Sequence, residues 1–140
     1  MKKRLALYYA FDENAKKMAQ TKAKELLADM TVEIRETKVR SKFNVMTSGA
    51  IEAMRMKKTE LEPLSVDFDD YGTIILIMPV WGGNPAPAMN SVIGLIPKGK
   101  EVEIYMVSPK GDSMKSADNT SNEIQKRGSH VTKYVDLKIG

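Results

Sequence analysis

The chain has 140 residues, the size of one domain with its own hydrophobic core. Its 42% hydrophobic and 29% charged residues are ordinary for a globular protein. The absence of Cys excludes disulfides, thiolate metal sites and a cysteine nucleophile, and the single His130 argues against a His-based metal cluster or a Ser-His-Asp triad.

The net charge of +4 is mildly basic, but lysine and arginine are mixed with acidic residues along the chain, so we expect no nucleic-acid binding. No apolar run approaches the ~20 residues of a transmembrane helix, so we expect no membrane span. The apolar run from Leu5 to Ala10 is short and is followed by Asp12, which predicts a first strand and not a signal peptide. We therefore expect a cytoplasmic protein.

The first third of the chain predicts a strand, a helix and an edge strand. Arg4–Ala10 is strand-like, and the apolar residues of Asn14–Met30 recur at helical spacing. Thr31–Thr37 alternates, with Val32 and Ile34 on one side, as a half-exposed edge strand does.

A second helix is predicted before the middle of the chain. It would begin near Thr47 or Ser48 as its cap, with one apolar face formed by Ala50, Ile51, Met54 and Met56. The loop that follows contains Asp67, Asp69 and Asp70, on which a metal-dependent hydrolase could be built. Because these acids precede the next strand, at the sheet end opposite the expected ligand crevice, we interpret them as solvated loop residues.

The most informative stretch is Tyr71–Pro87, YGTIILIMPVWGGNPAP. Thr73–Met78 is an unbroken apolar run rich in β-branched residues, which predicts a parallel strand covered on both faces. The density of Gly and Pro from Pro79 onward predicts that the strand ends there in a sharp turn. In open α/β sheets, ligands bind just beyond the carboxyl ends of the strands, and Trp81 would offer a flat apolar surface at such a place.

The rest of the chain continues the alternation of helix and strand. The predicted elements are a helix over Ala86–Ile96 with Pro87 in its first turn, a strand over Glu101–Val107, a polar loop over Ser108–Asp112, a helix over Ser116–Arg127 capped by Gly128, and a strand over His130–Ile139. This order predicts a single α/β domain in three layers, with an open parallel sheet between helices on both faces.

The PVWGGNPAP string and the pattern of most of the chain resemble the flavodoxin-like family, in which such a loop lies along the flavin ring. The resemblance implies a five-stranded sheet of order 2-1-3-4-5, flavin mononucleotide (FMN) as cofactor, and a role as electron carrier or small FMN oxidoreductase. It also implies a redox partner protein or a small-molecule substrate. The ring-side residues that it implies are Pro79, Val80, Trp81, Gly82, Gly83 and Asn84 in one loop and Ser108, Gly111 and Asp112 in another.

The loop after the first strand departs from the family. The family's Ser-x-Thr-Gly-x-Thr phosphate loop falls on Ala10–Ala15, which lacks its hydroxyls and its Gly, although by position Phe11, Asp12, Asn14 and Ala15 would still adjoin the phosphate. Asp12 and Glu13 suit the N-terminus of a helix but repel a phosphate. We therefore expect weakened FMN binding. No catalytic acid or base is assigned, because in such proteins the flavin carries the chemistry.

The family's fifth strand is followed by a helix that shares one sheet face with the first helix, and this sequence ends before such a helix. We expect a second copy of the chain to cover the strip, which would make a homo-oligomer; polar side chains on that face are the alternative. Two functions stay open: a flavodoxin-like redox protein, and a flavin-free binding or assembly module that uses the crevice or the strip.

Overall fold

The computed structural model describes residues 3–81 and 83–138. Its strands are β1 (Arg4–Tyr8), β2 (Met30–Glu33), β3 (Thr73–Trp81), β4 (Asn84–Pro85), β5 (Glu101–Ser108) and β6 (His130–Lys138). The main sheet is parallel, in the order β2-β1-β3-β5-β6, and the two-residue β4 pairs antiparallel with the end of β3. Because β4 is only a hairpin addition, this order confirms the predicted 2-1-3-4-5 arrangement.

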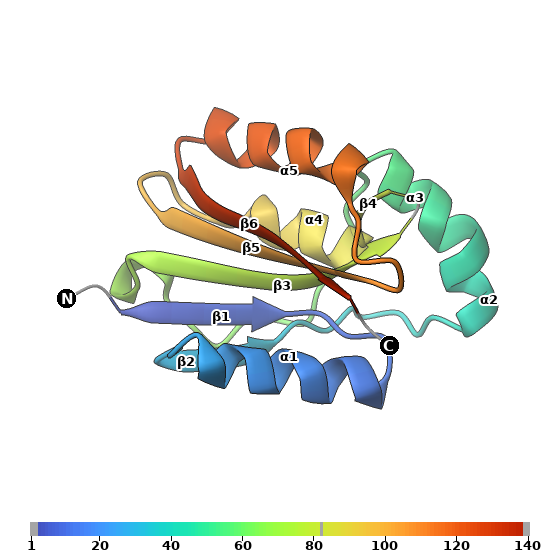
Figure 1. The fold of residues 1–140 in the computed structure, drawn as a ribbon, viewed down its shortest axis with the longest axis horizontal. Helices are drawn as coiled ribbons and strands as arrows, with labels where there is room; N and C mark the ends of the chain where they lie inside the picture. Colours follow the sequence, from blue (N-terminus) through green and yellow to red (C-terminus); the bar gives the residue numbers. More distant parts are fainter. Residues whose placement is uncertain (1–2, 82, 139–140) are drawn as a thin grey trace.

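Helices lie on both sides of the sheet (Figure 1). Helix α1 (Glu13–Glu25) packs on one face, and α4 (Pro87–Ile93) and α5 (Met114–Lys126) pack on the other. Beyond the carboxyl ends of β1 and β3 lies a continuous helical segment, made of α2 (Lys42–Asn44), a π-helical turn (Val45–Gly49) and α3 (Ala50–Met54). A 3-10 turn (Phe68–Asp70) precedes β3, and Asp67 caps it by accepting a hydrogen bond from the Asp69 N–H (2.9 Å).

Strand β3 is the centre of both hydrophobic cores. Ile74, Leu76 and Met78 face α4 and α5, whereas Ile75 and Ile77 face α1, and each of the five is at most 1% exposed. Burying such a side chain stabilises the fold by about 1.5–3 kcal/mol. The prediction of a strand covered on both faces is confirmed.

The sheet face that α1 covers carries charge beside that helix. The Arg4 guanidinium donates two hydrogen bonds to the Glu103 carboxylate (2.9 and 3.1 Å), and the Tyr105 hydroxyl donates a third (2.8 Å). The Lys22 ammonium lies 6.0 Å from the centre of the Tyr105 ring. Polar groups thus occupy part of the strip of the sheet that the family's last helix would cover. Polar side chains on this strip are one of the two alternatives predicted from the sequence, and coverage by a second copy of the chain is the other. Coverage by a second copy stays a prediction.

The second helix begins earlier than predicted. Ser41 is its N-cap, with a hydroxyl that accepts from the Asn44 N–H (3.0 Å), so the predicted start at Thr47 or Ser48 is wrong. The predicted apolar face is also wrong, because Ile51 and Met54 are 50% and 59% exposed while Ala53 is buried. This helix packs through its small residues, and larger apolar side chains are left on the outside.

Strand β3 also runs further than predicted. Pro79, Val80 and Trp81 belong to it, and Val80 and Trp81 pair with Pro85 and Asn84. Pro79 is tolerated because it lies beyond the last pair of β3 with β1, Ile77 with Tyr8, so that β1 does not require the N–H that proline lacks. Its carbonyl accepts from the Ala86 N–H (3.3 Å). Gly83 has a φ of +84°, which a tight two-residue hairpin turn requires.

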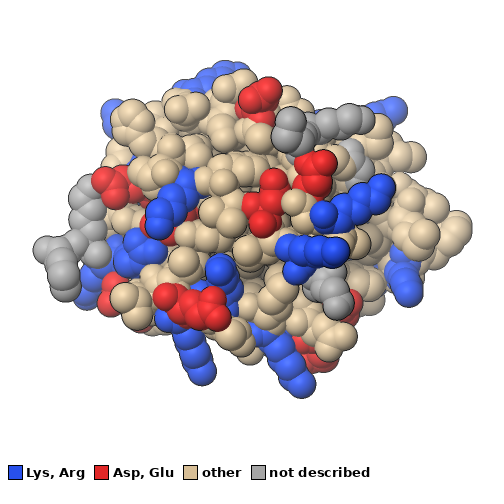
Figure 2. Space-filling model, viewed as in Figure 1, with Lys and Arg blue, Asp and Glu red and all other residues tan. Residues whose placement is uncertain are grey.

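The surface carries charges of both signs. Figure 2 shows lysine and arginine interspersed with aspartate and glutamate over the face turned to the viewer. Within residues 3–81 and 83–138, no helix is long and apolar enough to cross a membrane.

Candidate functional site

The loops that follow β1, β3 and β5 meet at one edge of the sheet, because the carboxyl ends of parallel strands lie at the same edge. The site residues predicted from the sequence lie in these loops and in the ends of the strands and of the helix that adjoin them. One of these residues, Gly82, lies outside the described residues.

The loop after β1 forms the N-terminus of α1. Asp12 is the N-cap, and its Oδ1 accepts a hydrogen bond from the Ala15 N–H (2.9 Å). A carboxylate at this position stabilises a helix by about 0.3–1 kcal/mol through the helix dipole. Asp12 and Asn14 are exposed, and Phe11 is 38% exposed. The protein's own carboxylate therefore occupies the helix end at which the resemblance implies a phosphate.

Trp81 is packed into the protein. It is 7% exposed and contacts Ala53 and Ala86 in a small hydrophobic cluster. The Tyr9 ring meets it edge-on at 5.8 Å, and the Arg40 guanidinium lies 5.4 Å from the centre of its ring. The half-exposed surface of the hairpin is supplied instead by Pro79, Val80 and Gly83.

A buried ionic cluster holds Trp81 in place. Arg40 Nε donates to both Glu36 oxygens (2.8 and 2.9 Å), the Tyr9 hydroxyl donates to Glu36 (2.5 Å), and Arg40 Nη2 donates to Glu52 (3.2 Å). The side chains of Arg40 and Glu36 are 2% and 3% exposed.

The pKa values within this cluster follow from its packing. Burial and the bond to Glu36 raise the pKa of Tyr9, so its hydroxyl stays a donor. Burial alone would raise the pKa of Glu52, but Arg40 outweighs it and holds that pKa below its usual value. Glu52 therefore keeps its negative charge near neutral pH.

Sequence reasoning missed this cluster. Glu36 and Arg40 are four residues apart, which predicts an ion pair on a helix, but the chain between them is not helical. Only the fold brings Tyr9, which directly follows β1, and Trp81, which ends β3, to them.

The loop after β5 is closed by its own hydrogen bonds. The buried Ser108 hydroxyl accepts from the Asp112 N–H (3.1 Å), and the Gly111 N–H donates to the Ser108 carbonyl (3.3 Å). Gly111 has a φ of +69° and is half-exposed, while Asp112 is exposed. Ser113, which prediction passed over, is buried and bonds to the Tyr134 hydroxyl (2.7 Å) and to Asp136.

Asn84, a predicted ring-side residue, is 7% exposed and ties the hairpin to its neighbours. Its Nδ2 donates to the Met54 carbonyl (3.3 Å), and its Oδ1 accepts from Asn119 Nδ2 (3.1 Å). Its amide is therefore engaged by α3 and α5.

Two ends of the site differ in what they can hold. Half-exposed apolar side chains and backbone at Pro79, Val80, Gly83 and Gly111 suit one side of a planar ring. The Asp12 and Glu13 carboxylates at the start of α1 do not suit a phosphate. Among the residues that the structure describes, no group of three or more His, Cys, Asp or Glu could hold a metal ion.

No protein-family model matches the chain, and no curated protein matches it significantly. Solved structures do. A flavoprotein from Lactobacillus acidophilus NCFM in complex with FMN superposes with a TM-score of 0.77 at 21% identity, covering 96% of this chain and 92% of that one.

A protein from Bacteroides eggerthii described as a flavoprotein gives a TM-score of 0.81 at 15% identity, over 100% of this chain and 91% of that one. A WrbA-like flavodoxin from Agrobacterium tumefaciens gives 0.55 at 10% identity, over 93% and 76%. The order of the strands, the placement of the helices and these superpositions agree, and the chain therefore has the flavodoxin-like fold.

Proposed function

We propose that this protein is a flavodoxin-like redox protein that binds the ring system of a flavin at the carboxyl edge of β1, β3 and β5. The observation that carries the proposal is the half-exposed surface of Pro79, Val80, Gly83 and Gly111 at that edge. The likeness in fold to a flavoprotein in complex with FMN supports it.

The phosphate contributes little to binding in this proposal. A phosphate near the start of α1 meets the carboxylates of Asp12 and Glu13, and each such pair costs about 1 kcal/mol at contact range even in water. The Ala15 N–H is already engaged by Asp12. FMN should therefore bind no more tightly than riboflavin, which has the same ring and no phosphate.

The flavin would supply the redox chemistry, and this chain would position its ring. Its main contribution would be the half-exposed Val80, whose neighbour Trp81 is packed against Arg40, Tyr9 and Ala86. Electrons would pass to a partner protein or to a small substrate at the exposed edge of the ring.

The test is a titration of the purified protein with riboflavin and with FMN, followed by quenching of flavin fluorescence. Val80→Lys, which places a long charged side chain at a half-exposed position of the surface proposed for the ring, should weaken both flavins at least tenfold. Asp69→Asn, on the 3-10 turn that precedes β3, is the matched control and should change neither affinity. Equal affinities in the wild type and in Val80→Lys would contradict the proposed location.

A second candidate is a flavin-free binding or assembly module. The observation that favours it is the packing of Trp81, which is 7% exposed beneath Arg40 and Tyr9, together with the Asp12 cap. A groove of about 370 Å³ between α1 and the end of β6, lined in part by Met18 and Leu137, would then seat a second copy of the chain. Sedimentation equilibrium distinguishes the two states, since a monomer at 100 µM would refute the dimer.

A further inference from the structure

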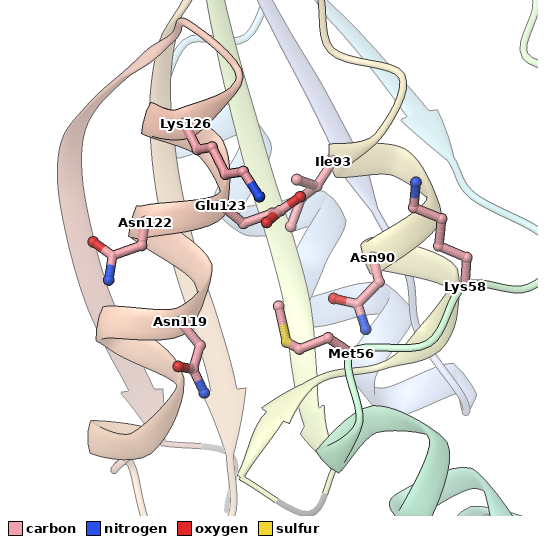
Figure 3. A pocket seen from close by; sticks show the side chains of 8 residues that line it. All are labelled: Met56, Lys58, Asn90, Ile93, Asn119, Asn122, Glu123 and Lys126. Carbon is pink, nitrogen blue, oxygen red and sulfur yellow. The ribbon is translucent and has the colours of Figure 1, made fainter.

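A cleft of about 330 Å³ lies between α4 and α5, on the sheet face opposite α1 (Figure 3). The chain that follows α3 closes one side of it. Its lining consists of three amide side chains, charged side chains and two apolar ones: Met56, Lys58, Asn90, Ile93, Asn119, Asn122, Glu123 and Lys126. None of these residues belongs to the flavin site proposed above.

Asn90 is the unusual member of the lining. It is 5% exposed, and its Nδ2 donates to the carbonyls of Lys57 and Pro85 (3.2 Å each). Its Oδ1 is buried and accepts no hydrogen bond from any residue within 3–81 and 83–138. A buried acceptor left without a donor costs about 1–3 kcal/mol.

The orientation of this amide is fixed by its neighbours. Turning the Asn90 amide over would place its oxygen against the carbonyl oxygens of Lys57 and Pro85, which would repel it. The oxygen therefore stays on the other side of the amide, and Figure 3 shows it directed toward the cleft. A ligand with an O–H or N–H group could donate the hydrogen bond that Asn90 Oδ1 lacks.

The opposite wall supplies further polar groups. Asn119, Asn122, Glu123 and Lys126 all come from α5 and line the cleft (Figure 3). Glu123 is paired with Arg127 (2.9 Å), whereas Lys126 forms no ion pair with any part of the chain that the structure describes. The cleft thus combines amides, which both donate and accept, with two cations, Lys58 and Lys126, that form no ion pair within residues 3–81 and 83–138.

We propose that this cleft binds a small polyhydroxylated molecule that carries one anionic group, such as a sugar acid or a sugar phosphate. Hydroxyl groups donate and accept, as the amide lining requires, and one of them would donate to Asn90 Oδ1. Lys126 would pair with the anionic group, and Met56 and Ile93 would pack against carbon atoms of the ligand. The volume lies at the lower end of the range of about 300–1,000 Å³ for small-molecule sites.

The test is a titration of the isotope-labelled protein with four probes up to 10 mM, monitored by two-dimensional NMR of the backbone and of the Asn side-chain amides. Gluconate and glucose 6-phosphate carry hydroxyls and a charge, glucose carries hydroxyls alone, and inorganic phosphate carries charge alone. The two complete probes should shift the signals of Asn90, Asn119 and Asn122 and bind at least tenfold tighter than glucose or phosphate. The stronger of the two identifies the anionic group.

The matched variants are Lys126→Gln on α5 and Lys24→Gln on the exposed side of α1. Lys126→Gln should weaken gluconate and glucose 6-phosphate at least fivefold with an unchanged backbone spectrum, and Lys24→Gln should leave both unchanged. The proposal is overturned if no probe shifts the three Asn signals at 10 mM, if glucose binds as well as gluconate, or if Lys126→Gln has no effect.

Discussion

Replacing Glu36 with Gln removes the charge that faces Arg40 inside the protein. Both side chains are at most 3% exposed, and breaking such a buried pair costs about 3–5 kcal/mol. Glu52 still faces Arg40 at 3.2 Å, and the new amide oxygen can still accept from Tyr9, so we expect the lower end, about 3 kcal/mol. With a urea dependence of about 2 kcal/mol per molar, the unfolding midpoint should fall by about 1.5 M.

Urea unfolding, followed by tryptophan fluorescence, measures this loss of stability with a probe that lies next to the ion pair. Trp81 is the one Trp in the sequence, and its ring lies 5.4 Å from the Arg40 guanidinium. Glu123→Gln, in an ion pair that is about a third exposed, is the control and should cost less than about 1 kcal/mol.

The triple variant Tyr9→Phe/Glu36→Leu/Arg40→Met separates the two possible origins of the loss, because it removes the buried pair together with the hydroxyl that donates to it. An apolar replacement of a whole buried pair is often neutral, and Glu52 keeps Lys38 as a partner (3.5 Å), so the triple variant should recover most of the stability that Glu36→Gln loses. A loss below about 1 kcal/mol in Glu36→Gln, or a triple variant less stable than the single one, would refute this reasoning.

Three further predictions concern the fold and the phosphate end of the site. Gly128→Ala should lower the free energy of unfolding by about 1–2 kcal/mol, because Gly128 has a φ of +95° and an added Cβ would lie 2.8 Å from the Cβ of Lys98; thermal unfolding checks this. Burial would raise the pKa of Glu103, but bonds from Arg4 and Tyr105 hold it below its usual value. The stability that Glu103 contributes is therefore fully present above the ordinary Glu pKa of about 4.3 and is lost as pH falls through the lower pKa of the folded protein. The difference in urea midpoint between wild type and Glu103→Gln should accordingly shrink from pH 6 to pH 3. Asp12→Ser keeps an N-cap and removes one negative charge, so it should strengthen FMN binding by about 1–2 kcal/mol and leave riboflavin unchanged in a fluorescence titration.

The sequence was most informative where one local pattern decides the structure. The apolar run from Ile74 to Met78 has no polar face, and a strand without a polar face must be covered on both sides. Likewise, Pro87 at the first position of α4 and Gly128 just after α5 have conformational limits that act within a residue or two.

Prediction of the buried face of the second helix failed, because contacts with residues far away in the sequence decide which of its side chains are buried. Ile51 and Met54 are apolar but lie outside, because the small Ala53 is the residue that packs beside Trp81. Arg40 and Tyr9 likewise come from other parts of the chain to pack around Trp81, whose place beside a ligand stays a prediction. The spacing of residues along the chain contains no information about such long-range contacts.

The central claim is that the carboxyl edge of the sheet binds a flavin ring with little help from the phosphate. Parallel titrations of the protein with riboflavin and FMN test it most directly. We expect that both flavins bind, with FMN no tighter than riboflavin. FMN binding that is at least a hundredfold tighter than riboflavin, or no binding of either at 100 µM, would contradict it.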